Sequence, residues 1–68
     1  MTLINMTTRN AFYTIRRNKT NVIMHFGRIN TQGQIRVAEF KDVRSARCFY
    51  QERIEQKLNR NYVQFVAA

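Results

Sequence analysis

Short runs of aromatic and β-branched residues, separated by polar segments with asparagine or glycine, make up most of residues 11–41, and apolar residues then recur at spacings of three and four. Aromatic and β-branched residues favour β-strands, and the longer spacing is typical of an amphipathic helix. The pattern predicts strands over residues 11–17, 22–29 and 34–41, a helix over 42–59 and a last strand over 62–66. This order predicts an α+β fold, with a small, mostly antiparallel sheet of four to five strands packed against one helix.

Turn-forming and capping residues separate the predicted elements. Residues 18–21 form an asparagine-containing turn, and Asn30 and Gly33 tolerate the positive φ that the next turn requires. Asp42 is a good N-cap for the helix, and Asn61 can end it in the left-handed region.

Two patterns in the second half of the chain concern burial. In the third strand Ile35 and Val37 share one face, but Ala38 and Phe40 share the face of Arg36, so a bulge or partial cover on both faces is expected. The helix has one apolar stripe that is expected to pack on the sheet: Val43, Ala46, Phe49, Tyr50, Ile54 and Leu58.

Length and composition limit the possible functions. With 68 residues and no Pro- or Ser/Gly-rich linker, residues 1–68 are expected to form a single domain, in which residues 1–9 are loose or an edge strand. Cys48 is the only cysteine and is expected to be packed; with His25 as the only histidine, no disulfide, metal site or cofactor is predicted. No catalytic constellation is present, so no enzyme is expected, and the chain is predicted to be cytoplasmic.

Charge points to a polyanionic partner. The formal net charge is +8, and residues 1–38 contain six basic residues without one acid, whereas residues 39–68 contain six basic and four acidic residues. Nine of the twelve bases are arginine, whose planar fork suits phosphate. This basic, one-sided composition favours nucleic acid over a merely solvated surface.

A candidate contact site lies at the end of the second predicted strand. Phe26 and Arg28 are two residues apart and so project from the same face, with only Gly27 between them. An aromatic ring can stack on a base, an arginine can bind phosphate, and a glycine lets another backbone come close. Val22 and Met24 lie on the same face as Phe26, so this short motif taken alone favours a core position for Phe26.

The longer spacing resembles the WGR domain family, named for Trp-Gly-Arg in this place. The resemblance covers about residues 10–65. It is carried by Phe12-Tyr13, Phe26-Gly27-Arg28-Ile29-Asn30-Thr31-Gln32-Gly33-Gln34, Phe40, Ala46, Phe49, Lys57 and Asn61-Tyr62. Two positions depart from the family pattern, because Phe26 stands where the family has tryptophan and Asn30 where it has glycine. The chain resembles the short, stand-alone members of the family, which are bacterial proteins.

The resemblance implies a module that binds duplex DNA, including ends or nicks, as this domain does in DNA-damage-responsive poly(ADP-ribose) polymerases. By that similarity Phe26 is the packing platform for a terminal nucleotide, Arg28 holds phosphate or bridges to a partner, and Asn10 and Gln34 contact the backbone. The resemblance does not extend to the catalytic domain of those polymerases, so it does not imply ADP-ribose transfer. Four further contacts are expected from charge alone: Arg16, Arg17, Lys19 and Arg36.

Two alternative functions use the same part of the chain. The Phe26 and Arg28 face can dock another protein or a second copy of the chain, since an aromatic beside an arginine is a common interface anchor. The sheet can also bind single-stranded RNA, with Tyr13 and Phe26 as stacking platforms.

Overall fold

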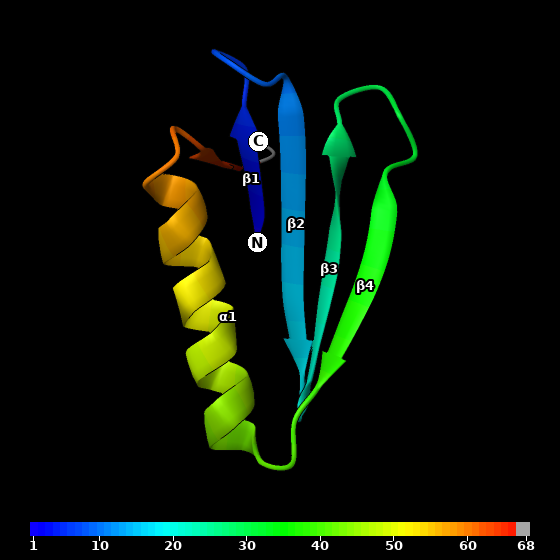
Figure 1. The fold of residues 1–68 in the computed structure, drawn as a ribbon, viewed down its shortest axis with the longest axis vertical. Helices are drawn as coiled ribbons and strands as arrows, with labels where there is room; N and C mark the ends of the chain where they lie inside the picture. Colours follow the sequence, from blue (N-terminus) through cyan, green and yellow to red (C-terminus); the bar gives the residue numbers. More distant parts are fainter. Residues whose placement is uncertain (67–68) are drawn as a thin grey trace.

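The computed structural model describes residues 1–66 as a five-stranded antiparallel sheet with one helix on one of its faces (Figure 1). The elements in chain order are β1 (Thr2–Asn5), β2 (Ala11–Asn18), β3 (Asn21–Arg28), β4 (Gln34–Glu39), α1 (Val43–Leu58) and β5 (Val63–Phe65). The predicted α+β class is confirmed. Residues 67–68, which belong to the predicted domain, lie outside the described part of the chain.

The N-terminal strand lies inside the sheet. The strand order is β4-β3-β2-β1-β5, so β1 pairs with β2 on one side and with β5 on the other. The expectation that residues 1–9 are loose or form an edge strand is therefore wrong for Thr2–Asn5. The reason is that α1 carries the chain across the sheet, so that β5 adds to the outer side of β1 and becomes the edge.

A small core lies between the sheet and the helix. Leu3, Ile15 and Val22 are fully buried on β1, β2 and β3, and they face Ala46 and Ile54 of α1. Tyr13, Met24 and Tyr62 complete the buried cluster. The buried strand residues lie at alternate positions of paired strands, so they project from the same face of the sheet, which is the face towards the helix.

The helix begins and ends close to the predicted positions. The Asp42 side chain accepts a hydrogen bond of 2.7 Å from the Ser45 amide, and this bond lowers the pKa of the Asp42 carboxyl. Asn61 has a φ of 68°, as expected for a left-handed residue after a helix. The stripe prediction fails at both ends of the helix, where Val43 and Leu58 are exposed because they are its terminal residues. Cys48 is also exposed, so the expectation of a packed cysteine is wrong.

The face of the sheet away from α1 is apolar and uncovered in the described part of the chain. Ile35 and Val37 on β4 are 68% and 55% exposed, and Val63 and Phe65 on β5 are 59% and 52% exposed. Pairing of β3 with β4 is continuous from Asn21↔Glu39 to Phe26↔Gln34, so β4 contains no bulge there. Neither expected explanation of the β4 pattern is correct, because only the helix side is partly covered, at Ala38 and Phe40, and the face of Ile35 and Val37 is open.

A buried asparagine joins two loops at the end of the sheet. Asn5 is 1% exposed, and its Oδ1 accepts hydrogen bonds from the amides of Thr7 and Thr8 at 3.1 Å each. Its Nδ2 donates to the Arg60 carbonyl at 3.0 Å, which ties the loop after β1 to the loop before β5. A buried polar side chain is stable only when its hydrogen bonds are satisfied, and Asn5 meets this condition with both of its amide atoms.

We expect Asn5→Ala to destabilise the fold by about 2–3 kcal/mol, because the Arg60 carbonyl and two loop amides lose their partner. Urea unfolding followed by circular dichroism measures the change. Asn18→Ala is the matched control, since Asn18 is exposed and a surface substitution typically changes stability by less than about 0.5 kcal/mol. Equal stability of the two variants would contradict this role of Asn5.

Candidate functional site

The loop between β3 and β4 is fixed by hydrogen bonds at several points. The Arg28 carbonyl accepts from the Thr31 amide at 3.1 Å and from the Thr31 Oγ1 at 2.7 Å. The Ile29 amide donates to the Asn10 carbonyl at 2.9 Å, which joins this loop to the start of β2. Asn30, with a φ of 72°, makes the tight turn, as predicted from its residue type.

His25 holds the far side of the same loop. Its Nε2 lies 2.6 Å from the Gln32 carbonyl oxygen, a contact in which a protonated Nε2 donates. The His25 ring also packs edge-on against Phe12, with the ring centroids 5.1 Å apart. These contacts give His25 a structural role on the face of the sheet away from the helix.

The two glycines of the motif pack against each other. A Cβ atom at Gly27 would lie 2.7 Å from the Gly33 Cα, a distance that real Cβ atoms do not tolerate. A Cβ atom at Gly33 would clash with the Phe26 carbonyl oxygen, and Gly33 also has a left-handed φ of 69°. The close backbone approach predicted for Gly27 thus exists, but the approaching backbone is that of the chain's own loop.

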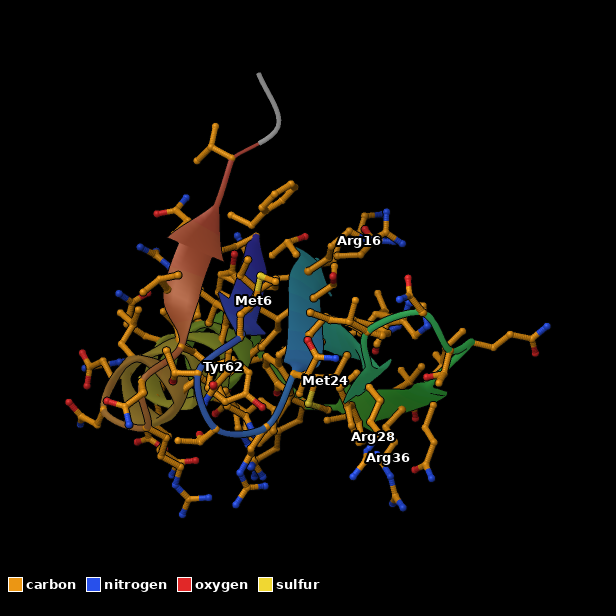
Figure 2. The ribbon with its side chains drawn as sticks, turned by 90° about the horizontal axis from the view of Figure 1, so that it is seen from above. Met6, Arg16, Met24, Arg28, Arg36 and Tyr62 are labelled. Carbon is orange, nitrogen blue, oxygen red and sulfur yellow. The ribbon has the colours of Figure 1, made fainter. Side chains whose placement is uncertain are left out.

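With the loop in place, Phe26 and Arg28 project from one face. In the register of β2 with β3, Phe26 lies opposite Tyr13 and Arg28 opposite Ala11, which places both on the helix side of the sheet. Figure 2 shows Arg28 beside Arg36 on this side, with Arg16 on the other. A shallow hollow of about 370 Å³ at this end is lined by Phe26, Gly27, Arg28, Thr31, Gly33 and Gln34.

Phe26 is partly buried: it packs against the core and also lines the hollow. Its ring centroid lies 5.9 Å from that of Tyr13. Tyr13 is only 4% exposed, so the RNA-binding alternative in which Tyr13 is a stacking platform is wrong. The alternative of a protein-docking face at Phe26 and Arg28 stays a prediction.

A basic cluster that the sequence did not predict lies next to this aromatic pair. The Lys57 Nζ lies 4.7 Å from the centroid of the Tyr13 ring and 5.2 Å from that of Tyr62, within the range of cation–π contacts. Burial lowers the pKa of Lys57, and the positive charges of Arg60, Arg9 and Arg53 lower it further. The only sequence signal for this cluster is Lys57 itself, within the spacing that resembles the WGR family.

The Tyr13 hydroxyl is the other unusual group in this region. It is buried and has no hydrogen-bond partner among residues 1–66, and burial raises its pKa. The positive charge of Arg53 lowers the pKa of Tyr13 and Tyr62 raises it, but burial has the largest effect. On the helix side of the sheet, the region around Tyr13 and Lys57 therefore combines aromatic rings with a positive potential.

The structure brings together only some of the predicted contact residues. Asn10, Gln34 and Arg36 lie at or near the hollow, because Asn10 bonds to Ile29, Gln34 lies opposite Phe26, and Arg36 is two residues further along β4. The three contact residues predicted from charge on β2 and its turn do not belong to this hollow. Arg17 and Lys19 are at the opposite end of the sheet, and Arg16 is on the uncovered face.

Comparison with known proteins identifies the fold and the family. The family model described as "WGR domain" matches residues 1–67. A crystal structure of a protein from Bacteroides fragilis superimposes with a TM-score of 0.91 at 24% sequence identity, covering 96% of this chain and 19% of that chain. The chain thus spans about a fifth of the length of that protein. No curated protein matches the sequence. Within residues 1–66, no helix has the length and apolar character needed to cross a bilayer.

We expect Gly27→Ala to destabilise the domain by about 1–3 kcal/mol, because the added methyl group forces the Gly33 backbone away. Chemical denaturation measures the loss, and amide chemical shifts over residues 28–34 report the displaced loop. Gln32→Ala is the control in the same loop, since Gln32 is exposed and its hydrogen bond to His25 uses the backbone carbonyl. A Gly27→Ala variant with unchanged stability and shifts would refute the packing role.

Proposed function

Because the chain belongs to the WGR domain family, we propose that it is a non-enzymatic DNA-binding module that contacts backbone phosphates and an accessible DNA end. In poly(ADP-ribose) polymerases this domain is a nucleic-acid-binding module. The observation that carries the proposal for this chain is the pairing of Phe26 with Arg28 on one face, at a hollow whose lining contains no acidic residue.

In the proposed complex each side chain at the hollow has a separate task. The accessible part of the Phe26 ring packs on a terminal base or sugar, and the Arg28 guanidinium donates to a nearby phosphate. Gln34 and Asn10 are close enough to the same end of the sheet to contact the DNA backbone. The loop glycines contribute indirectly, since they hold the hairpin that presents these groups.

The basic cluster around Lys57 supports an anionic ligand on electrostatic grounds. Arg9, Arg53 and Arg60 repel the Lys57 ammonium and contribute to its lowered pKa. A phosphate placed among these groups would relieve the repulsion and raise the pKa of Lys57, so binding and protonation favour each other. This cluster is adjacent to the hollow, because the Tyr13 ring contacts both the Phe26 ring and Lys57. A DNA backbone that contacts Arg28 can therefore extend to the cluster.

Phe26→Leu tests the aromatic contact while it keeps an apolar side chain in the core. We expect this variant to lose about 5- to 150-fold in affinity for a duplex with an open 5′-phosphorylated end, which corresponds to a stacking energy of roughly 1–3 kcal/mol. Fluorescence anisotropy with the open duplex and with a dumbbell closed at both ends measures the difference. Arg16→Gln is the control, because Arg16 is on the opposite face.

Two results would count against the proposal in different ways. Equal affinity of the wild-type protein for the open and closed DNAs would remove end recognition but leave phosphate binding in place. A logarithm of affinity that does not fall with the logarithm of salt concentration would remove the phosphate contacts as well.

Phe26→Trp tests the same contact in the other direction. Indole offers a larger face than phenyl, so we expect tighter binding to the open-ended duplex and little change for the closed dumbbell. The same anisotropy titrations measure both affinities, and thermal unfolding checks that the larger ring fits beside Tyr13. Weaker end binding by a variant as stable as the wild type would contradict a stacking role for residue 26.

A further inference from the structure

We propose a second phosphate-binding site on this molecule, formed by Arg17, Arg44 and Arg47 at the opposite end of the helix side from Phe26 and Arg28. Its ligand is the sugar–phosphate backbone of the duplex that is held at the first site. The inference rests on the proposed function for its choice of ligand, but its residues belong to neither the motif nor the Lys57 cluster.

The three arginines converge from two different elements on one hollow. Arg17 lies near the end of β2 on the helix side, and Arg44 and Arg47 lie on the first two turns of α1. They line a hollow of about 850 Å³ whose other lining residues are uncharged: Val43, Cys48, Tyr50 and Gln51. The Arg17 Nη1 donates to the Lys19 carbonyl at 3.0 Å, which holds its guanidinium at this end of the sheet.

Arg44 and Arg47 lie where a positive charge lowers the stability of the helix. Partial positive charge gathers at the N-terminus of a helix, so acidic residues stabilise the first turn and basic residues destabilise it. The first turn of α1 contains no acid but does contain Arg44, and Arg47 follows one turn later. Asp42, the acid that precedes the helix, has its carboxylate on the Ser45 amide. Residues that lower the stability of their own helix are expected at positions that serve binding.

The distance between the two sites suits a duplex. Ala11, opposite Arg28, and Arg17 are six residues apart on β2, which corresponds to about 20 Å along a strand. B-form DNA rises about 3.4 Å per base pair on each strand, so this separation spans about six base pairs. Figure 1 shows the β3–β4 hairpin at one end of the sheet and the start of α1 at the other. Arg36, opposite Met24, lies between the two sites on the same side.

The test compares hairpin DNAs that share one open 5′-phosphorylated end and differ in stem length, five or twelve base pairs. We expect the wild-type protein to bind the longer stem at least about tenfold more tightly. Arg44→Gln/Arg47→Gln should bind the five-base-pair stem like the wild type and lose the advantage of the longer stem. The slope of log affinity against log salt on the longer stem should become shallower by about 2, as expected for two lost phosphate contacts.

Arg16→Gln is the control for charge, since it removes one positive charge from the uncovered face and should leave the dependence on stem length unchanged. Thermal unfolding of the double variant provides a second readout. Its midpoint should be equal to or above that of the wild type, because two basic residues are removed from the helix N-terminus.

The outcomes separate this inference from the proposed function. If Arg44→Gln/Arg47→Gln keeps the full length dependence while Phe26→Leu loses end binding, the second site is wrong and the proposed function stands. If the double variant loses the length dependence while Phe26→Leu binds every DNA like the wild type, the second site stands and end recognition is wrong. An equal loss on both stem lengths, or a wild-type protein that binds neither DNA, overturns the second site.

Discussion

The close contact between the Gly27 and Gly33 backbones determines how the β3–β4 hairpin folds back on the sheet. Neither position has room for a Cβ atom, so the loop between them can lie flat only when both residues are glycine. The hydrogen bonds from Thr31 to the Arg28 carbonyl, and the contact of His25 with the Gln32 carbonyl, then fix the rest of the loop. The recognisable motif therefore consists mainly of residues that build the loop. Only Phe26, Arg28 and Gln34 are presented by it.

The sheet separates two chemically different surfaces. On the helix side, Arg28 and Arg36 continue the basic character of α1, and the rings of Tyr13 and Phe26 lie between them and Lys57. The other side carries exposed valine, isoleucine and phenylalanine side chains. A positive field concentrated on one side orients an approaching polyanion as well as attracting it, because only one face of the molecule is favourable. Net charge alone would give attraction without this orientation.

Local patterns predicted the fold better than they predicted the site. The runs of β-forming residues, the Asp42 cap and the positive φ at Asn30 and Asn61 are set by nearest neighbours, and all appear in the structure. The placement of β1 depends on pairing with β5, about sixty residues away, and no local pattern contains that information. For the same reason the approach of Arg9 to Lys57 was not predicted, since these two residues are distant in sequence. Asn5 was missed because a buried asparagine looks like a loop residue until its partner Arg60 is known.

The pairing of β1 with β5 has a consequence for how such a fold can be used by larger proteins. Thr2 lies directly opposite Phe65, so the chain enters and leaves the sheet at neighbouring points (Figure 1). A fold with adjacent entry and exit can be placed within a surface loop of a host without stretching either partner. The same geometry permits circular permutation, in which a short linker joins these neighbouring points and new ends are opened in the exposed turn at Lys19.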